Sequence, residues 1–199
     1  MNHSNVSIAR SPEQILSANK VLKNTYLLLS ATLGFSALTA MISMGMNMPP
    51  MTYMIALIAS MVLGIFVLPK TANSGTGIGV IFLITGLMGF GLGSVLSMYL
   101  ALPKGPEIIA TAFGGTGIIF LGLSGYALTS KRDFSFMQGF LFTGLMVVVI
   151  GSLLNMFFGS SLAQFMISGA AVLLFSGFIL YDTSNILRYY GTDEHISAT

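Results

Sequence analysis

The sequence predicts an all-α fold, a polytopic membrane helical bundle with six spans. Of the 199 residues, 54% are hydrophobic and only 7% are charged, whereas soluble domains carry about 25% charged residues. The mean hydropathy is +0.87. The apolar residues form six long stretches, each of about 20 residues, the length with which a helix crosses ~30 Å of hydrocarbon. Strands are not expected, because isolated strands leave their backbone groups unpaired in lipid.

Three regions are expected along the chain. A polar N-terminal tail occupies residues 1–24, and its part after Pro12 is suited to a helix. The membrane bundle occupies residues 25–188, and a polar segment follows over 189–199. Because the links between the apolar stretches are short, consecutive helices should be antiparallel neighbours. The predicted spans are Tyr26–Met46, Met51–Leu68, Gly77–Leu102, Ile108–Thr129, Phe134–Phe158 and Leu162–Tyr181, and the last one reaches Leu187 if its helix continues.

The basic residues predict the orientation, since cytoplasmic loops are enriched in Lys and Arg. With six spans, one side of the membrane carries only Lys104. The other side carries Arg10, Lys20, Lys23, Lys70, Lys131, Arg132 and Arg188. We therefore expect both termini, and with them the N-terminal tail, to lie in the cytoplasm.

Several classes of function find no support in the sequence. The chain has no cysteine, which excludes disulfides, thiolate metal sites and a cysteine nucleophile. Its basic residues are scattered along the chain, so nucleic acid is not an expected partner. No phosphate-binding loop, dinucleotide motif or cluster of metal ligands is present. Neither a cofactor nor a metal site is therefore expected.

One short motif would suit an intramembrane serine protease. Ser124 lies in the sequence G-L-S-G of Gly122–Gly125, within the fourth predicted span. A serine nucleophile needs a neighbouring base, but the two histidines, His3 and His195, lie in the polar tails. We therefore expect Ser124 to be a small packing residue and the protein not to be an enzyme.

Asp182 is the most informative polar residue, because it is the only acid within a long hydrophobic stretch. An ionisable group inside a membrane is costly and therefore suggests a functional site. In one interpretation the last span ends at Tyr181, and Asp182 belongs to its polar end. In the other the helix continues to Arg188, so that Asp182 lies inside the span and shares a face with Asn185 three residues later.

The second interpretation suggests a proton-sensitive latch. An ion pair with Asp182 would hold a pore shut, and protonation of the carboxylate would release it. The candidate counter-ions on the same membrane side are Lys70, Lys131 and Arg132.

Two further patterns concern helix packing. Asn155 lies in the fifth predicted span, where an amide needs a hydrogen-bond partner, so it either joins two helices or lines a pore. Small residues four apart let membrane helices approach closely. Such glycines are Gly75 with Gly79 and Gly89 with Gly93, and a further cluster consists of Gly114, Gly115 and Gly117.

Four segments resemble the Bax inhibitor-1 family, and most of all its bacterial YccA-like branch. They are K-V-L-K-N-T-Y at Lys20–Tyr26, Y-x-L-T-S-K-R-D-F-S-F at Tyr126–Phe136, G-S-L-L-N-M-F at Gly151–Phe157 and G-x-I-L-Y-D-T-S-N-I at Gly177–Ile186. The resemblance extends over nearly the whole chain, and the Y-D-T-S-N-I stretch is its most specific part.

The resemblance implies a seven-helix bundle in a bacterial inner membrane, with six helices around a central one. Several members of the family look like pH-sensitive calcium leak channels gated by two aspartates, of which Asp182 matches the first. The second would lie in a seventh span, which has no counterpart before Thr199. We therefore expect this chain to lack that span, through truncation or divergence.

Two functions follow from the resemblance. The first is a pH-sensitive cation leak, with calcium or protons as the permeant ions and Asp182 as the proton-sensing latch. The second, associated with the YccA-like branch, is that of a modulator and substrate of a membrane-anchored ATP-dependent quality-control protease, without transport activity. In that case the N-terminal tail would serve as the segment that the protease holds. The lipid bilayer is a partner in both.

Overall fold

The computed structural model describes residues 12–72, 74–130 and 132–189, and all regular structure in these ranges is helical. The chain divides into two compact units, one containing the helices up to Ile109 and the other comprising Ala110–Tyr189. The prediction of six spans is confirmed. The helical segments long and apolar enough to cross a membrane are Val21–Gly45, Met51–Thr71, Gly75–Leu100, Gly105–Ser130, Ser135–Phe158 and Ser161–Ile186.

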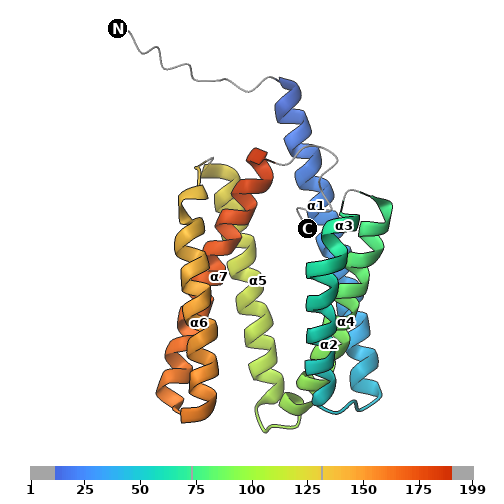
Figure 1. Cartoon of the computed structure of the whole chain (residues 1–199), viewed down its shortest axis with the longest axis vertical. Helices are drawn as coiled ribbons and strands as arrows, with labels where there is room; N and C mark the ends of the chain where they lie inside the picture. Colours follow the sequence, from blue (N-terminus) through green and yellow to red (C-terminus); the bar gives the residue numbers. More distant parts are fainter. Residues whose placement is uncertain (1–11, 73, 131, 190–199) are drawn as a thin grey trace. The chain divides into compact units, whose positions relative to one another are not determined.

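In the first unit, α4 packs against both α1 and α2 (Figure 1). A π-helical turn and the short helix α3 continue α2, so that these three segments form one span. The π turn precedes Pro69, which has no N–H to donate into a regular helix. The bounds are α1 Pro12–Gly45, α2 Met51–Val62, the π turn Leu63–Val67, α3 Leu68–Thr71 and α4 Gly75–Leu100.

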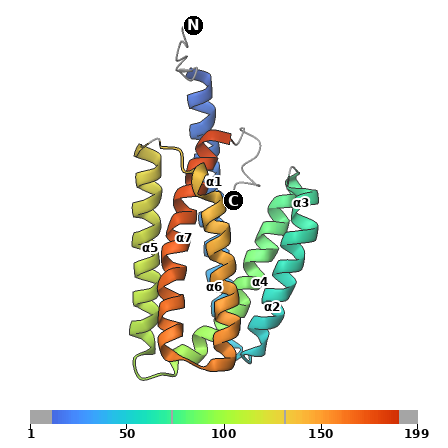
Figure 2. The ribbon, with the colours of Figure 1, turned by 60° about the vertical axis from the view of Figure 1, so that its left-hand side comes forward.

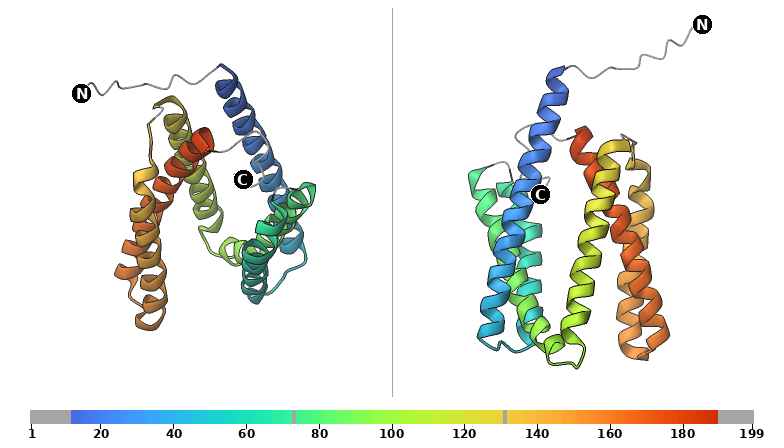
Figure 3. Two further views of the ribbon diagram at one scale, coloured as in Figure 1. Left: turned by 45° about the horizontal axis from the view of Figure 1, so that its top comes forward. Right: turned by 180° about the vertical axis from the view of Figure 1, so that it is seen from behind.

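The second unit contains most of α5 together with a helical hairpin. The helices α6 and α7 of this hairpin lie side by side (Figures 2 and 3). At their contact the Leu141 side chain is 1% exposed, and a Cβ at Gly177 would lie 2.6 Å from its Cδ2 atom. The bounds are α5 Gly105–Ser130, the 3-10 turn η2 Ser135–Met137, α6 Gln138–Phe158 and α7 Ser161–Tyr189.

One face of α1 is buried at intervals of three, four or eight residues, as expected for a helix that packs along one side. This face includes Val21, which lies before the predicted start of the first span at Tyr26. The predicted tail over residues 1–24 therefore overlaps the packed part of α1. The buried residues of this face are Val21, Thr25, Leu28, Thr32, Ala40 and Ser43.

Glycines on α4 allow its backbone to approach α1. A Cβ atom at Gly89 would meet the backbone carbonyl oxygen of Ser36, and one at Gly93 would meet that of Ala40. Because backbone atoms cannot move aside as a flexible side chain can, these two positions require glycine. The predicted close packing at Gly89 and Gly93 is therefore confirmed.

The other predicted glycine contacts are not found in the described part of the chain. A Cβ atom built at any of the glycines named below would have no neighbouring atom within 4 Å. Their spacing in the sequence therefore did not predict a helix contact correctly. A small residue favours close packing only if it lies on the face that meets another helix. The glycines concerned are Gly75, Gly79, Gly114, Gly115 and Gly117.

Substitution of Gly89 by alanine should loosen the contact between α1 and α4. We expect Gly89→Ala to lower the free energy of unfolding in detergent by about 1–3 kcal/mol, the typical cost of overpacking. Gly79→Ala on the same helix is the matched control, because its Cβ would meet open space. It should be neutral or stabilising, since alanine favours a helix over glycine by about 0.8–1 kcal/mol. Equal effects of the two substitutions would contradict the glycine contact.

Candidate functional site

Asp182 lies within a continuous helix. Helix α7 runs from Ser161 to Tyr189, and its apolar, membrane-compatible part extends to Ile186. The helix therefore continues beyond Tyr181, as the second interpretation requires, whereas the exposure of Asp182 agrees with the first interpretation, in which the acid belongs to the polar end of the helix. The sequence is apolar on both sides of Asp182. Leu180 and Tyr181 precede the acid, and Ile186 follows it.

Around Asp182, the helix buries the neighbouring hydroxyl groups and not the carboxylate. Thr183 and Ser184 are buried, Asn185 is half-buried and Asp182 is exposed. Asp182 makes no hydrogen bond or ion pair within the part of the chain that the structure describes. The face of α7 that packs on its own unit is thus the face of Ser184.

The three candidate counter-ions differ in their placement. Arg132 is exposed and belongs to the same unit as Asp182. Its backbone carbonyl accepts a hydrogen bond from the Ser184 hydroxyl at 3.3 Å, so the structure brings the backbone at Arg132 to the end of α7 that carries the acid. Lys70 is exposed at the end of the second span, in the first unit. Lys131 lies outside the described residues.

The role of Ser184 was not predicted from the sequence, although its spacing from Gly177 is a signal for it. Ser184 follows Gly177 by seven residues, a spacing that places both on one face of a helix. Gly177 faces Leu141 and Met137. Two turns later, the Ser184 hydroxyl meets the loop between α5 and η2, where it also accepts a hydrogen bond from the backbone N–H of Phe134 at 3.5 Å.

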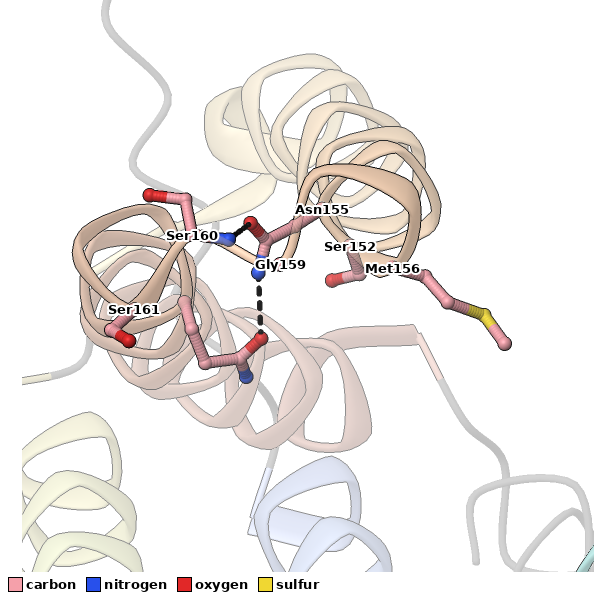
Figure 4. A pocket seen from close by; sticks show the side chains of 7 residues that line it. Ser152, Asn155, Met156, Gly159, Ser160 and Ser161 are labelled. Carbon is pink, nitrogen blue, oxygen red and sulfur yellow. Dashed lines mark hydrogen bonds between the residues drawn. The ribbon is translucent and has the colours of Figure 1, made fainter.

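Asn155 lies at the opposite end of the hairpin, where α6 turns into α7 (Figure 4). Its side-chain N–H donates to Gln164 Oε1 at 3.1 Å, and its side-chain oxygen accepts from the backbone N–H of Ser160 at 3.1 Å. Gly159 ends α6 in the left-handed conformation with φ 62°, which glycine adopts without strain. Both polar ends of the Asn155 amide are therefore used within the turn.

An open hollow of about 570 Å³ with a mixed polar and apolar lining lies beside this turn. Gln164 and Asp182 are separated by 18 residues of α7, which corresponds to about 27 Å along the helix. The hollow and the acid are thus two separate features of the second unit. The residues that line the hollow are Ser152, Asn155, Met156, Gly159, Ser160, Ser161 and Gln164.

The other residues weighed in the sequence form no catalytic arrangement within the described part of the chain. Ser124 on α5 is 3% exposed, and its hydroxyl has no hydrogen-bond partner there. His3 and His195 lie outside the described residues. In the same ranges, no group of three or more His, Cys, Asp or Glu side chains is placed to hold a metal ion.

Comparison with known proteins places the chain in a family. The family model described as "Inhibitor of apoptosis-promoting Bax1" matches residues 18–199. An uncharacterized membrane protein of Vibrio cholerae is 50% identical over 189 residues, which cover 95% of this chain and 84% of that protein.

Two proteins of Escherichia coli are each 41% identical over 194 residues, which cover 98% of this chain and 87% of the relative. The protein of strain K12 is named modulator of FtsH protease YccA, and that of strain O6:H1 is named inner membrane protein YccA. The six apolar helices and these matches together show that the chain is a membrane protein that belongs to the Bax inhibitor-1 family.

Proposed function

We propose that this chain is an inner-membrane modulator of a membrane-anchored ATP-dependent protease of the FtsH kind, with no catalytic activity of its own. The observation that carries this proposal is the identity of 41%, over 98% of the chain, with the Escherichia coli protein named as such a modulator. Because the identity extends over all six spans, the whole membrane bundle is shared and not a single motif.

The structure supports a defined segment for contact with the protease. Helix α1 begins at Pro12, and its first nine residues, P-E-Q-I-L-S-A-N-K at Pro12–Lys20, are largely polar, so a helical extension precedes the apolar part of the helix. The basic residues at this end, Lys20 and Lys23, support a cytoplasmic N-terminus. Val21 is fully buried in the structure, whereas Lys23 is exposed, so a deletion that ends at Lys20 leaves the packed part of α1 intact.

Deletion of residues 2–20 tests this proposal without removing the buried Val21. We expect the full chain to lengthen the half-life of a membrane substrate in proteoliposomes that contain the purified protease. The deletion should weaken association with the protease about tenfold, which corresponds to ~1.4 kcal/mol, as measured by coprecipitation from detergent. Lys104→Gln in the α4–α5 link is the matched control and should associate normally.

The two possible failures of this experiment have different meanings. If the deleted chain keeps its fold and still associates normally, the N-terminal segment is not the contact. If the full chain neither associates with the protease nor changes the half-life of the substrate, the modulator function itself is wrong.

A second candidate function is a proton-regulated calcium leak with Asp182 as the sensor. The observation that favours it is the continuation of α7 through Asp182, which supports a carboxyl group inside a span. Intramembrane acids commonly belong to ion pathways. The exposed Arg132 lies in the same unit and is the counter-ion whose backbone is held at this end of α7. Asn185 shares this helix end and would contribute a neutral polar group.

Asp182→Asn removes the titratable group while it keeps the size of the side chain. We expect calcium influx into liposomes to change between about pH 6 and about pH 8, where the shifted groups of functional sites often titrate. The change should be lost in the variant because the amide cannot gain or lose a proton. Glu107→Gln, which neutralises an acid in the first turn of α5, should leave the pH dependence intact. Influx that is indifferent to both pH and Asp182→Asn would exclude the leak.

A further inference from the structure

The loop between α5 and η2, residues 132–134 in the described part of the chain, lies against α7 in the second unit. We infer that Ser184 is a hydrogen-bonded pin that makes this loop and the Asp182 end of α7 move as one body. The inference concerns neither the protease nor ion flux and stands independently of both proposed functions.

The loop has backbone groups that no helix satisfies. Phe134 follows the end of α5 at Ser130 and precedes the 3-10 turn that starts at Ser135, so its N–H has no partner in regular structure. Its side chain is only 8% exposed, and buried N–H groups are nearly always hydrogen-bonded. Ser184 provides the acceptor at 3.5 Å.

One hydroxyl group serves two backbone groups in complementary roles. A serine hydroxyl can donate one hydrogen bond and accept others. Ser184 donates to the carbonyl of Arg132 at 3.3 Å and accepts from the N–H of Phe134. The side chain is 1% exposed, so water does not compete readily for these bonds. The two bonds connect residues 50 and 52 positions apart in the sequence.

Neighbouring contacts hold the loop in a shape that Ser184 can reach. The Asp133 carboxylate accepts hydrogen bonds from the backbone N–H and the hydroxyl of Ser135, which closes the start of the 3-10 turn. The Phe134 ring lies 6.3 Å from the Tyr126 ring of α5, measured between centroids. The loop is therefore shaped by its own residues, and Ser184 connects this preformed shape to α7.

The pin would make two separate segments of the sequence depend on one another. Tyr126–Phe136 contains the loop, and Gly177–Ile186 contains Ser184 and Asp182. A displacement of the acid-bearing end of α7 would pull on Arg132 and Phe134 through Ser184. The exposed Arg132 side chain would then move together with α7 at the surface of the second unit.

Hydrogen exchange tests the pin directly. In the full chain in detergent, Ser184→Ala should accelerate exchange of the Phe134 amide about three- to tenfold, the range expected for loss of one net hydrogen bond. Ser176→Ala is the matched control, because the Ser176 hydroxyl bonds only to Val172 in its own helix. It should leave exchange in the loop unchanged. An unchanged Phe134 amide in Ser184→Ala, or equal acceleration in both variants, would overturn the inference.

A distance measurement provides a second and independent test. The chain has no cysteine, so a pair of introduced cysteines can be spin-labelled specifically. Suitable positions are Phe136, 81% exposed beside the loop, and Leu173, 75% exposed on α7. The distance distribution between the labels should be narrow, should broaden with Ser184→Ala and should stay narrow with Ser176→Ala. If the distance distribution is equally narrow in the labelled chain and in its Ser184→Ala and Ser176→Ala variants, other contacts hold the loop and Ser184 is not the pin.

Discussion

Helix association in this protein depends on small residues and on side-chain hydrogen bonds, because lipid removes the hydrophobic driving force between apolar helices. In the first unit the glycines of α4 bring its backbone against α1 at Ser36 and Ala40. In the second unit Gly177 accommodates Leu141. Side-chain hydrogen bonds then close the hairpin at one end through Asn155 and hold the loop at the other end through Ser184. Large apolar side chains mostly remain exposed on the helix surfaces, as suits contact with lipid.

The most distinctive segment of the sequence, Y-D-T-S-N-I, combines two kinds of residue on one helix end. Thr183, Ser184 and Ile186 face the interior of their unit, whereas Asp182 remains exposed. The buried residues fix the position of the helix, and the exposed acid is the group available for chemistry or for a partner. Substitutions in this segment should therefore differ in their effects, since a change at Ser184 alters helix packing and a change at Asp182 alters only an exposed group.

Composition and the length of the apolar stretches were sufficient to predict the six spans, because both follow from the thickness of the membrane. Helix boundaries were harder to predict. Thr183, Ser184 and Asn185 suggested the end of a span, yet the helical hydrogen bonds continue past them. Ser184 was missed because its role depends on a loop 50 residues earlier in the sequence. The glycine pairs show the same limit, since spacing does not reveal which face of a helix meets a neighbour.

The π-helical turn at Leu63–Val67 changes the register of the second span. A π turn accommodates one residue more than an α-helical turn, and each residue of an α-helix advances by about 100°. Residues on the two sides of the turn therefore do not follow a single helical stripe. Ala56 and Ser60 face α4 before the turn, and the extra residue of the turn offsets the residues after it, including Lys70, from the helical stripe that these two residues begin. A helical-wheel projection of the whole span would thus assign the wrong direction to Lys70.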